Sequence, residues 1–288
     1  YFAKGFEYDS KKINPKTEEE SKTMKSIGGE MLYTPGDIVY SSTKIINQAL
    51  PDLSTLKLSH ILKKNKLSFS HLEQTLEKFN KIKIHVVGDT IVDTYTQGSF
   101  IGGQTKTPTM SVLYESHKDY VGGAGIVSKH LRAAGANVVF SSILGNDHLK
   151  NFVLDDLKKN KVQSKIIIDP SRPTVNKNAI ISSGYRLLKI DKIDNRSISN
   201  EILNKIISNI KSLKSHGIIL CDFRHGIFNK STINKIVNSI PKNVFKSADS
   251  QVASRWGNIV EFKGFDLITP NEREARFSLG DQDSVIRP

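Results

Sequence analysis

The sequence has a single cysteine, a single tryptophan and no long run of apolar residues. One cysteine, Cys221, cannot form a disulfide within the chain, which is typical of proteins kept in a reducing compartment. No apolar stretch approaches the roughly 20 residues that a membrane-spanning helix needs. Residues 1–12 also lack the basic-then-apolar order of a secretory signal. We therefore expect a cytoplasmic protein with no membrane partner.

Negative charge is scarce relative to positive charge, because 42 lysines and arginines face 29 aspartates and glutamates and leave a net charge of +13. A nucleic-acid-binding surface would gather these cations with aromatic residues in one stripe. The lysines are instead spread over helix-like stretches such as 202–216. We therefore expect no nucleic-acid partner, while attraction of phosphorylated small molecules remains compatible with the charge. Nucleic-acid binding stays open as an alternative that rests on charge alone.

In residues 1–50, strand-like and helix-like stretches alternate, which indicates a partial α/β segment. A strand at 1–5, a polar helix at 18–28 and a strand at 29–34 precede a Ser-Ser-Thr turn that starts another helix. Fifty residues are too few to bury an adequate core alone. Residues 51–80 carry apolar residues near helical spacing and predict a helical linker.

From residue 81 onward, short β-branched runs alternate with amphipathic stretches, which predicts a parallel sheet sandwiched by helices. The expected strands lie at 82–87, 137–144, 164–169, 217–222, 244–249 and 265–269. The expected helices lie at about 124–134, 147–159, 198–214 and 229–239. Two stretches break the alternation, 107–120 and 177–193, and both predict antiparallel strands of a small β-flap beside the sheet.

Open parallel sheets bind ligands at the carboxyl ends of their strands, so polar residues just after a strand are the first candidates for a site. Asp89 and Asp93 follow the first strand and could accept hydrogen bonds from substrate hydroxyls, although Asp89 by itself is more typical of a turn cap. Gly122 and Gly123 precede a helix, where freed amides and the helix dipole suit a polar ligand. Packing explains such glycines equally well.

Two further strand ends carry polar residues. Asp222 could hold a metal or a substrate hydroxyl, and the following Arg224 and His225 could face phosphate, although a surface-loop histidine is the more ordinary interpretation of His225. At the last strand, Asn271 and Glu274 have the spacing of a capping box, which alone would account for both.

The order of these motifs resembles the PfkB (ribokinase-like) carbohydrate kinases: GDxxxD at 88–93, GGAG at 122–125, AAGA at 133–136, LGND at 144–147, the flap, the strand-end Asp222 and TPNxxE at 269–274. It is closest to the sugar-phosphate branch, exemplified by the heptose 7-phosphate kinase of ADP-heptose synthesis. The resemblance covers residues 81–288.

The resemblance implies ATP as phosphoryl donor and Mg²⁺ as cofactor. It further implies that Asp93, Gly122 and Gly123 contact the sugar, that the flap residue Lys177 lies over it, and that Asn271 and Glu274 help to place Mg²⁺ and the nucleotide phosphates, with no direct metal ligand. The strand-end residues Asp89 and Asp222 are the further candidates for substrate binding. Ile126 and Val127 stand where the family usually has a sugar-binding Asn. The family's catalytic Asp belongs to a GAGD motif that the 288 residues lack. We therefore expect the base to follow Pro288, and this stretch alone to be inactive.

Residues 4–8 and 28–47 resemble the closing segment of cytidylyltransferase-like nucleotidyltransferases. There a Lys-Gly strand end and a Ser-Ser-Thr helix start hold the nucleotide, and Lys4, Ser41, Ser42 and Thr43 match them. Hydroxyls and free amides at a helix N-terminus suit phosphate, and a plain N-cap accounts for these hydroxyls equally well.

The two resemblances together predict a bifunctional protein: an ATP-dependent carbohydrate kinase at 81–288, a helical linker at 51–80 and the end of a Rossmann-like nucleotidyltransferase at 1–50. Its substrates would be a sugar or sugar phosphate, ATP and, for the second step, CTP as a candidate. A homodimer through the flap is expected by family analogy. The alternative is a non-catalytic sugar-binding or scaffold module with a kinase-like fold.

Overall fold

The structure is a computed structural model that describes residues 2–5, 15–29, 31–34, 53–103, 110–251 and 258–281. The chain divides into two units, Tyr1–Phe69 and Ser70–Pro288. The division falls within residues 51–80, which the sequence predicts to be a helical linker.

The first unit contains a parallel pair of short strands, β1 (Phe2–Gly5) and β2 (Met31–Thr34), connected through helix α1 (Pro15–Ser26). Helix α3 (Leu53–Lys64) follows. The strand–helix–strand order agrees with the α/β interpretation of this segment. The predicted phosphate-binding residues Ser41, Ser42 and Thr43 lie outside the described residues.

Helix α4 (Phe69–Glu77) starts at the boundary of the two units and is followed by the 3-10 turn η2 (Lys78–Lys81). The centre of the second unit is a six-stranded parallel sheet of order β12-β11-β10-β3-β6-β7. All neighbours in this sheet run parallel. The strands are β3 (Lys83–Gly88), β6 (Asn137–Leu144), β7 (Gln163–Ile168), β10 (Gly217–Asp222), β11 (Phe245–Ser250) and β12 (Leu267–Ile268). Each of the six predicted strands is therefore present.

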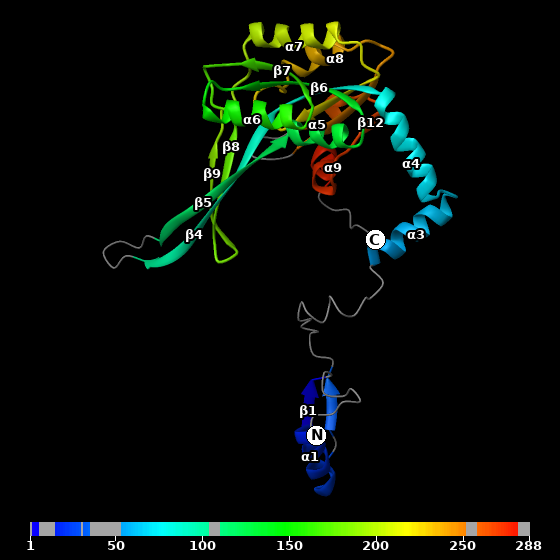
Figure 1. Ribbon diagram of the computed structural model, residues 1–288, viewed down its shortest axis with the longest axis vertical. Helices are drawn as coiled ribbons and strands as arrows, with labels where there is room; N and C mark the ends of the chain where they lie inside the picture. The colour runs from blue at the N-terminus through cyan, green and yellow to red at the C-terminus, as the bar shows by residue number, and fades with distance from the viewer. Residues whose placement is uncertain are drawn as a thin grey trace. The chain divides into compact units, whose positions relative to one another are not determined.

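Helices cover both faces of this sheet (Figure 1). They are α5 (Ala124–Ala133) and α6 (His148–Lys159) on one face, and α7 (Asn200–Ser212) and α8 (Ile233–Ser239) on the other. The central strands are buried on both faces, as expected for a covered parallel sheet. Along β3, Val86 joins the core under α5 and α6, and Val87 joins the core under α7 and α8. The alternation of side chains along a strand thus supplies two hydrophobic cores from one apolar run.

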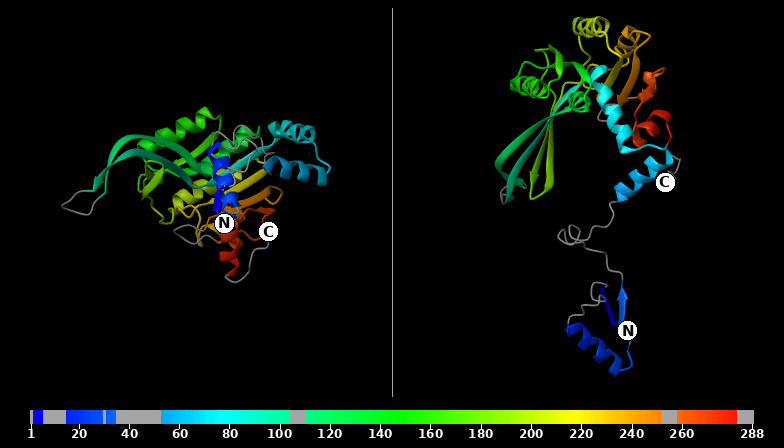
Figure 2. Two further views of the ribbon diagram at one scale, coloured as in Figure 1. Left: turned by 90° about the horizontal axis from the view of Figure 1, so that it is seen from below. Right: turned by 45° about the vertical axis from the view of Figure 1, so that its right-hand side comes forward.

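A four-stranded flap of order β5-β4-β8-β9 extends beyond the main sheet (Figures 1 and 2). Its strands are β4 (Thr90–Gly103), β5 (Met110–Gly123), β8 (Asn176–Ser182) and β9 (Tyr185–Lys192). The two predicted antiparallel stretches correspond to β5 and to the β8–β9 hairpin. The long strand β4 was not predicted, and it joins them by pairing antiparallel to β5 and parallel to β8.

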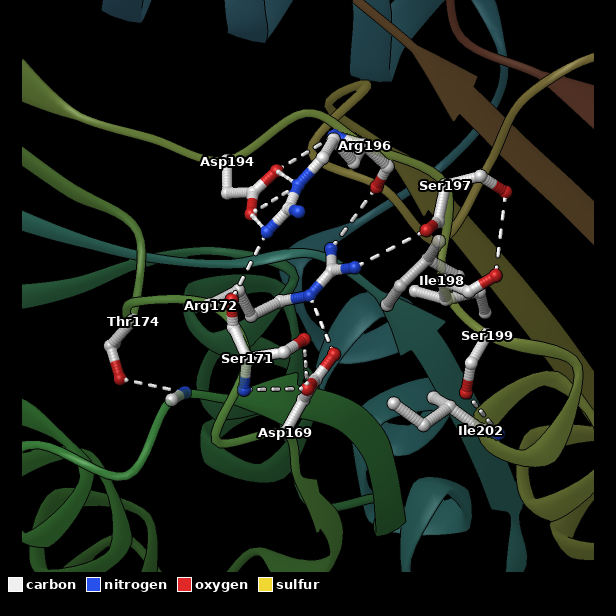
Figure 3. A network of polar contacts seen from close by, with 12 residues as sticks. Asp169, Ser171, Arg172, Thr174, Asp194, Arg196, Ser197, Ile198, Ser199 and Ile202 are labelled. Carbon is white, nitrogen blue, oxygen red and sulfur yellow. Dashed lines mark hydrogen bonds and ion pairs between the residues drawn. The ribbon is translucent and has the colours of Figure 1, made fainter.

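Two arginines clamp the loops at the base of the β8–β9 hairpin (Figure 3). Arg172, before β8, forms an ion pair with Asp169 (Nε to Oδ2, 2.7 Å) and donates to the carbonyl oxygen of Arg196, after β9, at 3.2 Å. Arg196 donates in return to the carbonyl oxygen of Ser171 at 3.1 Å and pairs with Asp194. The hydrogen bond from Arg196 lowers the pKa of Asp194 to about 2. The loops that enter and leave the hairpin are therefore held together.

Candidate active site

The candidate site forms where the chain changes direction across the sheet, at the carboxyl ends of β3 and β10. From β3 the chain continues to β6 on one side, and from β10 it continues to β11 on the other. Loops that diverge in this way leave room for a ligand between them. The residues that follow these two strands are therefore the first candidates for the site.

Asp89, directly after β3, holds the loop that follows β10. Its carboxylate accepts hydrogen bonds from the backbone amides of Phe223 (3.1 Å), His225 (3.1 Å) and Ile227 (3.4 Å). Burial raises the pKa of Asp89 to about 6, although these hydrogen bonds act to lower it. Both oxygens are engaged, so the carboxylate orders the loop, and its contact with substrate stays a prediction.

Gly122 and Gly123 must be glycines because two polar groups lie directly against them. A Cβ atom on Gly122 would collide with the carboxylate of Asp93, and one on Gly123 would collide with the carbonyl oxygen of Asp89. Gly123 also has φ of +58°, which disfavours other residues. The same carbonyl of Asp89 accepts from the amide of Ala124, the first residue of α5, at 2.9 Å. The glycine pair thus lets Asp93 lie against the start of α5.

Asp93 belongs to a row of side chains that crosses all four flap strands. It is opposite Tyr120 on β5 and Lys177 on β8, and Lys177 is opposite Asp191 on β9. Directly opposed residues point to the same face of a sheet. Burial raises the pKa of Asp93 while Lys177 opposes the change, and burial lowers the pKa of Lys177. Two predicted sugar ligands, Asp93 and Lys177, are therefore neighbours.

Asp93 and Gly122 line one cavity of about 720 Å³ between the flap and α5. Tyr95 and Tyr120 line it as well, with ring centroids 5.8 Å apart in an edge-to-face arrangement. A carboxylate beside two aromatic rings is a suitable lining for a polyol, since hydroxyls bond to the acid and C–H faces pack on the rings. The sequence analysis missed both tyrosines. For Tyr95 a signal was available, because it lies two residues after Asp93 and therefore on the same face of strand β4.

The loop after β10 differs from the sequence expectation for its two basic residues. Arg224 does not face an open phosphate site, since it is buried and forms ion pairs with Asp222 (Nε to Oδ2, 3.0 Å) and with Glu261. His225 is not a surface residue either, because it is only 5 % exposed. Burial raises the pKa of Asp222 to about 7, and its carboxylate also accepts from Ser250 at 2.8 Å. Asp222 therefore anchors this loop, and its contact with substrate stays a prediction.

At the carboxyl end of β12, helix α9 (Glu272–Leu279) begins with the capping box that the sequence indicated. The Asn271 side chain accepts from the amide of Glu274 (3.0 Å), and Glu274 accepts from the amide of Asn271 (2.8 Å). Asn271 lines a second, open cavity of about 720 Å³ at the start of α9. Within the described parts of the chain, no group of three His, Cys, Asp or Glu side chains could ligate a metal ion.

Of the predicted nucleotidyltransferase residues, only Lys4 falls in a described strand, β1, whose side chains are not described. The roles of Lys4, Ser41, Ser42 and Thr43 therefore stay predictions. In the part of the chain that the structure describes, none of the helices has the length and apolar character needed to cross a membrane.

Solved structures share this fold at low sequence identity. Arabidopsis thaliana ribokinase, complexed with ribose and ATP, superposes with a TM-score of 0.53 and 14% identity, covering 69% of this chain and 64% of that one. Phosphofructokinase-2 from Escherichia coli, in complex with substrates and products, reaches a TM-score of 0.55 at 10% identity with the same coverage. The expected ribokinase-like α/β fold with a flap is confirmed.

Residues 81–286 match the family described as pfkB family carbohydrate kinase, and the chain belongs to that family. Among curated proteins, it is 30% identical over 213 residues to the bifunctional protein HldE of Aliarcobacter butzleri, covering 72% of this chain and 44% of that protein. It is 27% identical over 212 residues to the bifunctional protein HldE of Helicobacter hepaticus, covering 71% and 43%. The chain thus spans less than half the length of these relatives.

Proposed function

We propose that the protein is an ATP-dependent kinase of a sugar or sugar phosphate. The observation that carries the proposal is the Asp93 carboxylate lying against Gly122 in a cavity beneath the flap, in a chain of the PfkB family. Family membership does not favour the alternative of a non-catalytic sugar-binding module.

In the proposed reaction, a hydroxyl oxygen of the sugar attacks the γ-phosphorus of ATP. A new O–P bond forms, the bond from the γ-phosphorus to the β,γ-bridging oxygen breaks, ADP leaves, and the hydroxyl proton passes to a general base. Asp93 orients the sugar by accepting hydrogen bonds from its hydroxyls. Lys177, beside it, offsets the negative charge that gathers in the site. The flap covers the sugar and excludes water from the transferring phosphoryl group.

Magnesium would enter this site bound to the phosphate oxygens of ATP. Asn271 and Glu274 are the residues proposed to lie near the nucleotide phosphates, at the amino end of α9, where the helix dipole favours anions. Each commits one side-chain oxygen to the capping box.

We further propose that the intact protein is bifunctional and adds a nucleotidyl transfer, with CTP as a candidate substrate, to the kinase step. The support is the resemblance of residues 1–50 to nucleotidyltransferases and the fact that both HldE relatives are named bifunctional proteins. The division into 1–50, the helical linker 51–80 and the kinase domain 81–288 is part of this proposal, as are a cytoplasmic location and a homodimer through the flap.

The test is ATP consumption by the product of the complete reading frame, with ribose, fructose 6-phosphate and a heptose 7-phosphate as acceptors. We expect ADP release that depends on one of these sugars and equimolar formation of its phosphorylated product. ATP turnover that no member of the panel stimulates would contradict the proposal. Binding of a sugar without any phosphoryl transfer would favour the non-catalytic module.

A further inference from the structure

His225 has a buried imidazole, and one of its two nitrogens has no hydrogen-bond partner among the described residues. Its Nδ1 atom lies 2.9 Å from Oδ1 of Asn195, while its Nε2 atom is buried and has no hydrogen-bond partner in the structure. An amide oxygen cannot donate, so Nδ1 carries the proton in this contact, and Nε2 is left as an acceptor. Buried polar atoms normally find a partner, and one that has none calls for an explanation.

Three separate contacts fix the position of this ring. The backbone amide of His225 donates to the carboxylate of Asp89 at 3.1 Å. The next residue, Gly226, accepts from the amide of Ile198 at 3.2 Å, and its φ of +116° brings it so close to Arg172 that a Cβ atom would collide with that guanidinium. The backbone that carries the imidazole is therefore held at His225 and at Gly226.

The third contact comes from the clamp at the base of the hairpin. Asn195, which receives the Nδ1–H bond, lies between Asp194 and Arg196, whose ion pair orders this loop (Figure 3). Arg172 binds the carbonyl oxygen of Arg196 from the opposite loop. A ring held this firmly, with one atom free, has the organisation of a ligand-binding group.

His225 is linked to two predicted sugar-binding residues, Asp89 and Lys177. The carbonyl of Asp89, whose carboxylate binds the His225 amide, also accepts from Ala124 next to the glycine pair. Lys177, the neighbour of Asp93 across β4 and β8, lies close enough to act electrostatically on the ring. Burial, the larger cause, together with Lys177 lowers the pKa of His225 to about 4, so the ring is neutral near pH 7.

We propose that His225 is a specificity-determining residue of the carbohydrate site, where its Nε2 atom accepts a hydrogen bond from one hydroxyl group of the bound sugar. This inference rests on the proposed kinase function. A site built to bond a hydroxyl discriminates strongly against an analogue that lacks it, because the buried acceptor is then left unpaired. Phe223 and Arg224, which flank the same loop, have no comparable free acceptor: the Arg224 side chain is engaged by Asp222 and Glu261.

The test uses the complete gene product and isothermal titration with ribose, fructose 6-phosphate and a heptose 7-phosphate, followed by monodeoxy analogues of the sugar that binds best. His225→Asn keeps a polar group at the Nδ1 position and removes Nε2, whereas His225→Gln places a polar group near Nε2. We expect His225→Asn to weaken binding about tenfold and His225→Gln to stay within about threefold of the wild type. Melting temperatures of both variants within about 3 °C of the wild type would show that the fold is retained.

The analogues identify the hydroxyl. One monodeoxy sugar should bind the wild type about tenfold more weakly than its parent, and should show no such loss with His225→Asn. Equal affinity of wild type and His225→Asn for the parent sugar would overturn the inference while leaving the kinase proposal intact. The same loss with the analogue in both proteins would also overturn it. If the wild type binds none of the three sugars, the proposed function fails, and this inference fails with it.

Discussion

Buried ionisable groups gather at the carboxyl ends of β3 and β10, and their roles differ at the level of single residues. Asp89 and Asp222 have raised pKa values because they are buried, and each is held by hydrogen bonds that order the same loop. Asp93 is only partly buried, and its carboxylate reaches a cavity. The carboxylate that borders open space is therefore the one suited to bind a ligand.

Replacing Asp93 with alanine should separate ligand binding from stability. We expect Asp93→Ala in the complete gene product to weaken sugar binding by about tenfold or more, because charge-assisted hydrogen bonds to hydroxyls are lost. The melting temperature should stay within about 3 °C, since no described hydrogen bond of the fold depends on this side chain. Asp89→Asn is the control, and it should lower the melting temperature because it disturbs the loop after β10. A large loss of stability in Asp93→Ala would instead make this residue structural.

His85 provides a test of burial through pH. It is 1 % exposed in β3, and burial, assisted by Lys83, lowers its pKa from 6.5 to about 4. Below pH 6.5 His85 takes up a proton in the unfolded chain, whereas in the folded chain it does so only near pH 4. The folding stability that is present above pH 6.5 is therefore lost as the pH falls toward 4. The free energy of unfolding of the wild type, relative to His85→Gln, should fall by about 2 kcal/mol between pH 7 and pH 5.

Urea unfolding at the two pH values measures this difference, and the contributions of His225, Asp89 and Asp222 cancel because both proteins carry them. A relative stability that does not change with pH would show that His85 is protonated in the fold as readily as in the unfolded chain.

Among the elements, α9 shows that the TPNxxE motif has a structural role, because it caps the start of the helix. Its capping box satisfies two backbone amides with Asn271 and Glu274. Asn271→Ala should lower the free energy of unfolding by about 1 kcal/mol, measured by denaturant titration. The control is Glu272→Ala, which removes only the exposed pair with Arg276 and should cost less than about 0.5 kcal/mol. Equal losses in the two variants would contradict the capping role.

The flap carries an exposed apolar surface on the face opposite the Asp93 row. Leu188 is opposite Ile180 on β8, which is itself opposite Thr96 of β4, and Ile190 is one step further along the same face. Leu188 and Ile190 are 57% and 52% exposed. Exposed apolar groups clustered on a strand face mark interaction sites. This face supports the proposed pairing of flaps between two copies of the chain.

The double variant Leu188→Glu/Ile190→Lys should therefore convert a dimer to a monomer in sedimentation velocity experiments, because charges would be buried in the interface. Lys205→Glu on α7, away from the flap, is the control and should sediment as the wild type does. A wild type that sediments as a monomer at micromolar concentration would contradict the homodimer proposal.

At the scale of the whole molecule, the net charge of +13 comes from lysines and arginines that are spread along the sequence. Lys129 on α5, Lys189 on β9 and Lys205 on α7 are each paired with an acid. We expect no retardation of random-sequence DNA in a gel shift at about 150 mM salt, where non-specific binding needs many phosphate contacts. Binding that persists at this salt concentration would restore the nucleic-acid alternative.

Local periodicity determined most of the main sheet in advance. Apolar β-branched runs and amphipathic helices identified the six strands and their covering helices, and the order of short motifs identified the family. Strand β4 (Thr90–Gly103) was missed because it starts two residues after β3 ends and contains Gly98, Gly102 and Gly103, although Thr90–Thr96 is rich in β-branched residues. Its extended conformation is stabilised by pairing with β5 and β8. The sequence predicted β5 and the β8–β9 hairpin separately. It did not predict the parallel pairing of β4 with β8 that joins them into one sheet.

The sequence by itself determined the alternation of elements, the sites of strand ends and the membership of a kinase family, because these follow from local spacing. Only the tertiary structure decided which strand-end residues are available to a ligand. Asp89, Asp222 and Arg224 are engaged by Phe223, Ser250 and Glu261 respectively, which lie far away in the chain. Asp93 and the Nε2 atom of His225 have no such partner in the described parts of the chain and remain available. Such partners are set by strand pairing and loop packing, which bring distant segments together and which no local pattern encodes.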